Sequence, residues 1–170
     1  MIKRPVPVFG LGTAATAEYA VLDHWARKPD ALNWQQAASV AVAAETAARV
    51  LAALGMQPGQ TLLIDNASGA VGQAATQLAR PSGVTVVGTA SEANHTRLRD
   101  LGVIPVTYGP GLPERVDAAT SKTIDAAIDA AGRGSVPELV QLTGSPNKVI
   151  TIADSTAGRH SVAVNAEPSE

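Results

Sequence analysis

Short apolar segments alternate with helix-like segments from residue 60 onward, and this alternation constrains the fold more than any other feature. The pattern predicts strands at residues 61–64, 84–89, 104–108, 123–128, 149–152 and 161–164, with helices at 70–80, 94–101, 112–120 and 136–142. Apolar strands that alternate with helices of this length are typical of βαβ units. We therefore predict an α/β fold with a mostly parallel six-stranded sheet and helices on both faces.

The N-terminal part of the chain follows a different pattern. Two short apolar runs flank a glycine-rich turn and predict strands at Val6–Phe9 and Ala17–Leu22. Asn33 then offers an N-cap, and Gln36 stands three residues later, as in a capping box. A long alanine-rich helix is predicted to follow and to end near Leu54.

Composition excludes several classes of function. The 13 basic and 15 acidic residues leave a net charge of -2, and only five residues are aromatic, so we expect no nucleic-acid partner. The chain has no cysteine and its three histidines lie far apart, which predicts no metal site. Apolar runs are interrupted before they reach a membrane-spanning length, and no signal peptide is recognisable. We expect a cytoplasmic protein without a membrane partner.

A glycine turn lies between the first predicted strand of the alternating series and its helix. Ala67, Gly69 and Gly72 stand at the spacing of a G-x-G-x-x-G motif. In that motif the first small residue makes the turn, the second lets a diphosphate approach bare backbone, and the third lets helix and strand pack closely. Free N–H groups at the start of the helix then face the diphosphate.

The spacing alone is a weak signal, because the chain is rich in glycine and alanine. A looser copy at Gly10–Ala15 precedes a strand-like run and has no helix after it. The copy that starts at Ala67 opens a βαβ series, which favours a dinucleotide site. A purely structural glycine turn is the alternative.

Several phrases in order resemble the cofactor-binding half of the zinc-independent medium-chain dehydrogenases/reductases, in the quinone-oxidoreductase-like branch. The phrases that carry the resemblance are Ala17–Leu22, Ala31–Ala38, Pro58–Ala79, Val86–Ser91, Leu98–Gly102, Ile124–Gly132 and Lys148–Asp154. The resemblance implies a doubly wound Rossmann fold that binds NADPH, without zinc. It also implies hydride transfer to the C=C or C=O bond of a quinone, enone or similar compound.

The resemblance also implies a set of cofactor-binding residues and no catalytic acid or base. They are Thr46 near the nicotinamide, Ser68, Gly69, Ala70 and Val71 at the diphosphate, Ser91 and Tyr108 near the adenosine ribose, and Ala131, Gly132, Ile152, Ala153 and Asp154 along the adenosine and nicotinamide sides. Ala67 and Gly72 of the glycine motif complete the predicted cofactor-binding set.

Three departures from the family pattern affect cofactor binding. Asn66 and Ala70 stand where family members usually carry glycine, and the basic residue that often follows the second strand is absent. Basic side chains remain nearby at His95, Arg97 and Arg99.

The end of the second strand of this series favours NADP over NAD. An NAD enzyme places Asp or Glu there to bind the ribose hydroxyls, whereas this chain has Ala90 and Ser91. Glu92 comes later, where it suits a helix start; a ribose ligand is the alternative.

We expect three parts in the chain. Residues 1–25 resemble the last strands of a GroES-like catalytic domain, 26–165 form the dinucleotide-binding domain, and 166–170 form a frayed tail. Such a chain looks like an excised cofactor domain with little activity alone. The alternative is a non-catalytic nucleotide-binding or structural domain that kept the fold.

The aspartates near the predicted strands are interpreted as structural residues, and the last predicted strand indicates how the chain assembles. Asp65 is interpreted as a turn cap, with orientation of the loop amides as the alternative, and Asp125 and Asp129 as polar residues at strand ends. The segment 161–164 reads as an edge strand without Lys or Pro. The resembling family pairs through this edge, which predicts a homodimer.

Overall fold

The computed structural model describes residues 6–15 and 17–164. The chain divides into two compact units, residues 1–45 and 46–170. In the first unit, β1 (Val8–Leu11) and β2 (His24–Arg27) form an antiparallel pair. Helix α1 (Trp34–Leu54) begins in this unit and continues into the second. The tail predicted at 166–170 lies outside the described residues.

The strand predicted at Ala17–Leu22 is wrong. Residues 17–23 form bends and irregular backbone, and Tyr19 and Val21 expose more than 80% of their surface. The partner of β1 comes later, and β1 itself begins two residues after the predicted start. At Gly10 an added Cβ would lie 2.0 Å from the carbonyl oxygen of His24, so backbone contact determines this pairing.

The capping box at the start of α1 is confirmed. The backbone N–H of Gln36 donates to Asn33 Oδ1 at 2.8 Å, and the N–H of Asn33 donates to Gln36 Oε1 at 2.9 Å. Two N–H groups that a helix start leaves without backbone partners are therefore satisfied.

Helix α1 is the one helix among the described residues that is long and apolar enough to cross a membrane by length and composition alone. The expectation that no segment could span a membrane rested on the length of uninterrupted apolar runs. The mean hydropathy along α1 is nevertheless high enough for a membrane-spanning helix. Core helices of soluble proteins pass the same test. Ala47 and Val50 in its second half are fully buried in the core of the second unit.

The second unit contains a six-stranded parallel sheet in the order β5-β4-β3-β6-β7-β8. Its strands are β3 (Thr61–Asp65), β4 (Thr85–Thr89), β5 (Ile104–Val106), β6 (Ala126–Asp129), β7 (Val149–Thr151) and β8 (Ala163–Val164). Its other helices are α2 (Ala70–Ala79), α3 (His95–Asp100), α4 (Leu112–Ala119) and α5 (Val136–Thr143). The chain winds outward from β3 in one direction and from β6 in the other, so the predicted doubly wound α/β fold is confirmed.

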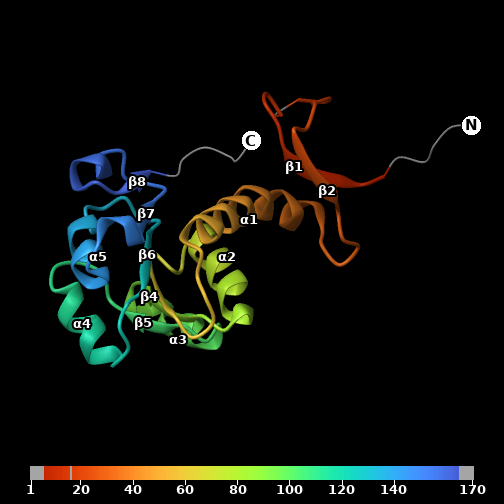
Figure 1. Cartoon of the computed structure of the whole chain (residues 1–170). Helices are drawn as coiled ribbons and strands as arrows, with labels where there is room; N and C mark the ends of the chain where they lie inside the picture. The colour runs from red at the N-terminus through yellow and green to blue at the C-terminus, as the bar shows by residue number, and fades with distance from the viewer. Residues whose placement is uncertain (1–5, 16, 165–170) are drawn as a thin grey trace, which may run out of the picture. The chain divides into compact units, whose positions relative to one another are not determined.

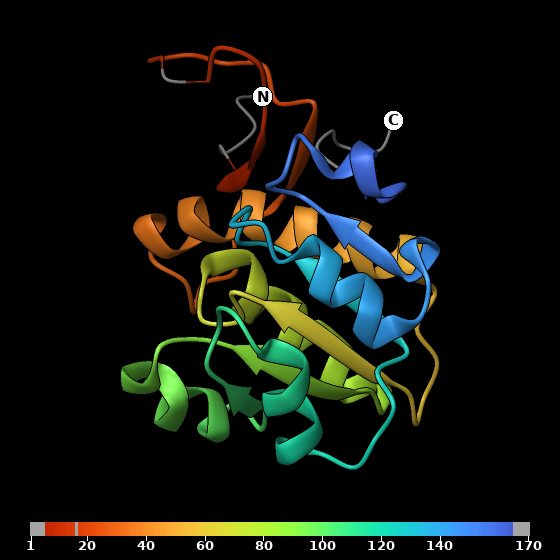
Figure 2. The ribbon, with the colours of Figure 1, turned by 90° about the vertical axis from the view of Figure 1, so that its left-hand side faces the viewer.

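Alternate residues of the strands enter two separate cores. Leu62 and Ile64 pack on the face covered by α2 and α3. Leu63 packs on the opposite face, beneath α4 and α5. Figure 1 shows these two helical layers on either side of the sheet, and Figure 2 shows the strands from the α4 and α5 side. Strands buried on both faces explain why the sequence shows continuous apolar runs.

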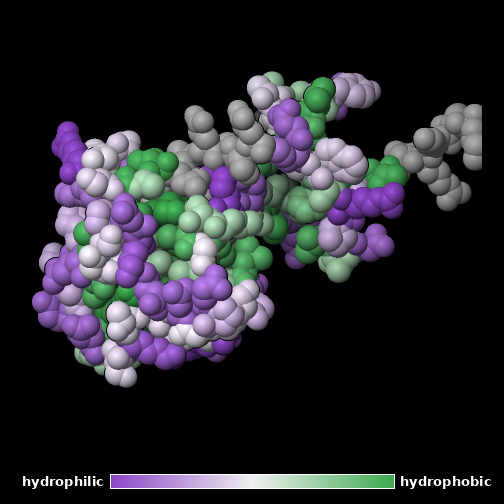
Figure 3. All heavy atoms as spheres, in the orientation of Figure 1, coloured by the Kyte–Doolittle hydropathy of each residue, from purple (hydrophilic) through white to green (hydrophobic). Residues whose placement is uncertain are grey.

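Large apolar side chains are rarely exposed on the second unit. Among the described residues of that unit, only Leu78, Tyr108 and Val164 are large, apolar and exposed. Polar residues cover much of its visible face (Figure 3). Tyr108 and Val164 are therefore informative exceptions, the first at the candidate site and the second at the sheet edge.

Candidate functional site

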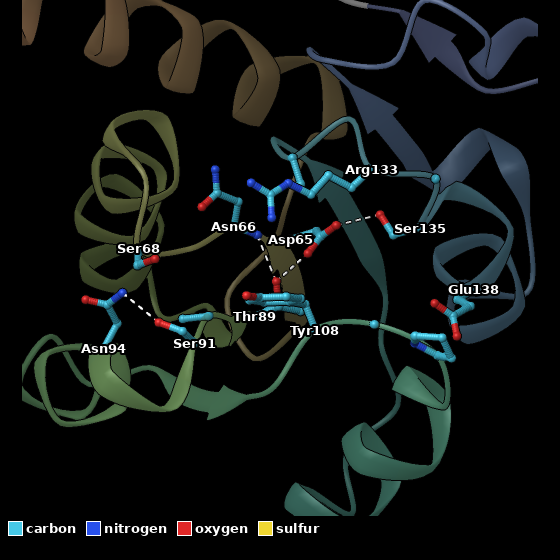
Figure 4. Close-up of a pocket in the computed structure, with 15 residues that line it drawn as sticks. Asp65, Asn66, Ser68, Thr89, Ser91, Asn94, Tyr108, Arg133, Ser135 and Glu138 are labelled. Atoms are coloured by element: carbon cyan, nitrogen blue, oxygen red, sulfur yellow. Dashed lines mark hydrogen bonds between the residues drawn. The ribbon is translucent and has the colours of Figure 1, made fainter.

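The carboxyl ends of the central strands border a pocket of about 570 Å³. Residues at or after the ends of four strands line it: Asp65, Asn66 and Ser68; Thr89, Ala90, Ser91 and Asn94; Tyr108, Gly109 and Pro110; Ala131, Arg133, Gly134, Ser135 and Glu138 (Figure 4). It includes the switch point between β3 and β6, from which the chain winds in opposite directions. Open α/β sheets bind ligands at this place, and the volume suits a small molecule or cofactor.

The glycine turn connects β3 to α2 with little space between them. A Cβ on Gly72 would lie 2.4 Å from the carbonyl oxygen of Asn66 and 2.6 Å from Ala67 Cα. Ala67 is itself fully buried. The third glycine therefore lets the helix approach the turn, as the motif requires.

Asn66 adopts a left-handed backbone conformation, with φ of 65°. Asparagine tolerates this conformation better than most residues, so it can stand where the resembling family has glycine. Its side-chain amide donates to the carbonyl oxygen of Ala130 at 3.1 Å. The turn after β3 is thus attached to the segment after β6.

Helix α2 begins beside the pocket without a side-chain cap. Its N-cap is Gly69, which has no side chain to offer. The N–H groups of the first turn of a helix have no partner within the helix and attract anions. Ser68 lines the pocket just before this helix start.

Asp65 accepts hydrogen bonds from the end of β4 and from the residue before α5, and is not the turn cap that the sequence predicted. Its carboxylate is buried and accepts hydrogen bonds from the hydroxyls of Thr89 and Ser135, the latter at 2.5 Å. Thr89 Oγ1 also accepts the N–H of Asn66 at 2.9 Å. Figure 4 shows this chain of bonds across the pocket floor. Both carboxylate oxygens are engaged, so Asp65 serves to position the turn.

Asp129 holds the loop after β6. It is fully buried, and its Oδ1 accepts the N–H groups of Ala131 and Gly132, each at 2.9 Å. Its Oδ2 accepts the hydroxyl of Thr151 at 2.8 Å. Asp125, at the other end of this segment, accepts the N–H of Thr61 at 2.8 Å. Both aspartates are polar residues at strand ends, as predicted.

The ends of β4 and β5 present uncharged groups to the pocket. Ser91 Oγ accepts a hydrogen bond from Asn94 Nδ2 at 3.1 Å. Glu92 begins a short 3-10 helix (Glu92–Asn94) and does not line the pocket. Tyr108 lines it and is 48% exposed, so its ring does not fill the core.

The basic residues expected near the ribose do not line the pocket, and two of them lie within hydrogen-bonding distance of other groups. Arg97 donates to Gln73 Oε1 at 2.7 Å, and His95 Nε2 lies 3.3 Å from the carbonyl oxygen of Ala90. Neither lines the pocket, and nor does Arg99. Arg133 is the cationic residue that does.

The segment after β7 forms a tight polar turn. Thr156 donates to Asp154 Oδ1 from its backbone N–H and its hydroxyl, both at 2.7 Å. These bonds hold the pKa of Asp154 below its ordinary value. The carboxylate is therefore charged at neutral pH.

Of the predicted cofactor-binding residues, four line the pocket: Ser68, Ser91, Tyr108 and Ala131. Ala67, Gly69, Ala70, Val71 and Gly72 form the turn and helix start beside Ser68, and Gly132 is adjacent to Ala131. Ile152, Ala153 and Asp154 follow β7, and Thr46 is buried in α1; these four do not line the pocket.

Sequence reasoning missed Arg133, Ser135 and Glu138 as pocket residues. Their position in the sequence could have identified them, because they follow β6, the neighbour of β3. The carboxyl ends of parallel strands lie at one edge of the sheet, so residues after β6 come close to the glycine turn after β3. In the described part of the chain, no group of three His, Asp or Glu side chains could hold a metal ion.

No protein-family model matches the chain. A 99-residue segment is 46% identical to erythronolide synthase EryA2 of Saccharopolyspora erythraea, covering 56% of this chain and 3% of that protein. A 127-residue segment is 35% identical to the human synaptic vesicle membrane protein VAT-1 homolog, covering 72% of this chain and 32% of that protein. The chain thus spans a third or less of these relatives.

The fold is similar to a solved quinone oxidoreductase from Coxiella burnetii. The two superpose with a TM-score of 0.69 at 28% sequence identity. The match covers 85% of this chain and 47% of the other, so this chain spans about half of that protein.

Proposed function

Because this chain is a Rossmann domain of the quinone-oxidoreductase-like medium-chain dehydrogenases/reductases, we propose that it binds a nicotinamide dinucleotide in the pocket beside the glycine turn. The observation that carries the proposal is the pocket at the switch point of the sheet, next to the uncapped start of α2. The glycine turn and the start of α2 fit the diphosphate of such a cofactor, because Gly69 leaves the backbone bare at the place where the diphosphate would lie.

We propose NADPH rather than NADH as the preferred cofactor. A ribose with two free hydroxyls is normally held by a carboxylate at the end of the second strand of the fold, and the pocket lining at the end of β4 contains none. Asp65 has both oxygens engaged. The carboxylate of Glu138 is also engaged, because its Oε1 accepts the N–H groups of Gly111 at 3.2 Å and Leu112 at 3.4 Å.

We propose that the whole protein reduces the C=C or C=O bond of a quinone or enone. The Coxiella burnetii relative is a quinone oxidoreductase. When bound, the nicotinamide supplies the hydride. The residues of this chain bind and orient the dinucleotide, and the proposal needs neither zinc nor a catalytic acid or base from it. We expect little turnover from this chain alone.

A second candidate is a non-catalytic nucleotide-binding or structural domain that kept the fold. The exposed Ala70 side chain at the start of α2 favours it, because a methyl group there narrows access to the helix N–H groups. A structural domain predicts no dinucleotide binding, whereas a non-catalytic nucleotide-binding domain predicts binding without reductase activity.

Parallel calorimetric titrations with NADPH and NADH test the proposal. We expect micromolar binding of NADPH and at least tenfold weaker binding of NADH. Stronger binding of NADH would contradict the cofactor preference and implicate Glu92 as a ribose ligand. Binding of neither would mean that a further domain is needed to complete the site, or that the glycine turn has only a structural role.

We also propose that the protein is a cytoplasmic homodimer that pairs through residues 161–164, without a membrane or nucleic-acid partner. The buried Ala47 and Val50 in the second half of α1, which pack in the core of the second unit, support its role as a core helix. The exposed edge strand β8 supports the dimer.

A further inference from the structure

A single cationic side chain lines the pocket. Arg133 lies in the loop between β6 and α5, flanked by Gly132 with φ of 62° and Gly134 with φ of 81°. Its side chain is exposed, and none of the other lining residues is Lys, Arg or His. The charge of the pocket lining therefore depends strongly on this residue.

Arg133 has no hydrogen-bond or ion-pair partner among the residues that the structure describes. The carboxylate of Asp65 is occupied by two hydroxyls. By contrast, the guanidinium of Arg115 donates to the carbonyl oxygens of Thr107, Gly109 and Pro110. Arg115 is thus committed to its own loop, whereas Arg133 is available to a ligand.

The loop that carries Arg133 is anchored at both ends. Asp129 accepts the N–H groups of Ala131 and Gly132 before it, and the hydroxyl of Ser135 donates to Asp65 after it. The glycines on either side of Arg133 adopt the positive φ angles that let this short loop turn. A guanidinium on such a loop can adjust to an anion while its base stays in place.

In the view of Figure 4 the side chain of Arg133 points toward Asn66, whereas Ser91 and Asn94 lie beyond Asp65 and Thr89. The hydrogen bond from Asn66 to Ala130 keeps these two segments together. Ser91 and Asn94 follow β4, on the far side of β3 from β6. Arg133 is therefore placed toward the turn and not toward the adenosine 2′-phosphate expected at the end of β4.

We propose that Arg133 binds the diphosphate of the dinucleotide, in a chain that lacks the basic residue often found after the strand that corresponds to β4 in the resembling family. This inference rests on the proposed function. A guanidinium matches two phosphate oxygens with parallel N–H groups. The diphosphate would then contact the start of α2 on one side and Arg133 on the other. Since NADPH and NADH share this diphosphate, Arg133 contributes affinity without selecting between them.

The test compares Arg133→Gln with the unaltered chain by calorimetry. Charge-assisted hydrogen bonds predict a loss of affinity of about 10- to 100-fold, by the same factor for NADPH and NADH. Arg133→Lys should recover part of the loss. Raising the salt concentration should weaken binding to the unaltered chain more than to Arg133→Gln.

Lys148→Gln is the matched control. Lys148 is exposed and precedes β7, so it lies at the amino ends of the strands, opposite the pocket. We expect unchanged affinity for this variant, and unchanged thermal unfolding for Arg133→Gln, since that side chain has no partner in the described structure.

Three outcomes overturn the inference. Equal affinities of Arg133→Gln and Lys148→Gln, with the unaltered chain still binding, would show that Arg133 does not contact the cofactor. A loss confined to NADPH would move the contact to the 2′-phosphate. If the unaltered chain binds neither dinucleotide, the proposed function fails and the inference fails with it.

Discussion

At the scale of single residues, buried carboxylates organise the turns around the pocket. Asp129 is fully buried and accepts two backbone N–H groups and one hydroxyl. Asp125 is only partly buried and its carboxylate accepts one N–H group. A buried donor that loses its acceptor costs more than an exposed one, because water cannot replace the bond.

Asp129→Ala should therefore destabilise the protein by about 3 kcal/mol, and Asp125→Ala by about 1 kcal/mol. Urea unfolding followed by circular dichroism measures both. The matched pair lies on the same segment and differs in burial and in the number of donors. A loss for Asp129→Ala no greater than that for Asp125→Ala would contradict this account of the loop.

At the scale of elements, the distance between α2 and the glycine turn depends on the missing side chain of Gly72. The atoms that an added Cβ would meet belong to the backbone of Asn66 and Ala67, which cannot rotate away. Moving the helix would in turn disturb Ala75 and Ala79, which pack in the core beneath it.

We expect Gly72→Ala to lower the free energy of unfolding by about 1–3 kcal/mol, the usual cost of overpacking. Gly158→Ala is the control, since an added Cβ there meets nothing within 4 Å, and its effect should be within about 0.5 kcal/mol. Thermal unfolding of both variants provides the comparison. Equal stability of the two would mean that α2 can move at little cost.

At the scale of the whole molecule, the two edges of the sheet differ in their capacity to pair. The edge strand β5 contains Pro105, which cannot donate a backbone hydrogen bond. The other edge, β8, contains Ala163 and Val164, both exposed and neither blocking. An unblocked edge strand is a template for pairing with another chain.

The proposed dimer predicts that Val164→Lys yields a monomer, because like charges would face each other across a two-fold axis. Leu78→Lys is the control, since Leu78 is 45% exposed, close to the 47% of Val164, but lies on α2. Light scattering coupled to size exclusion gives the mass of each variant. A monomeric unaltered chain, or a dimeric Val164→Lys, would disprove pairing through this edge.

The order and type of elements in the second unit were predictable, and their ends were less so. The strand predicted at 104–108 stops at Val106, and the one predicted at 123–128 starts at Ala126. Tyr108 has β propensity, but it leaves the sheet and enters the pocket lining. In the first unit Ala17–Leu22 had a strand-like pattern, but this segment forms bends and β1 pairs with the later strand β2, so local preference was not enough.

Local patterns were sufficient to establish the helices, the buried strands and the glycine turn, because periodicity, caps and turn residues act over a few neighbouring positions. Folding alone brought Asp65 to Thr89 and Ser135, and placed Arg133 by the turn. These groups lie on separate strand–helix connections, far apart in the sequence. They meet because parallel pairing collects the carboxyl ends of the strands at one edge, and the register of that pairing is a property of the folded sheet.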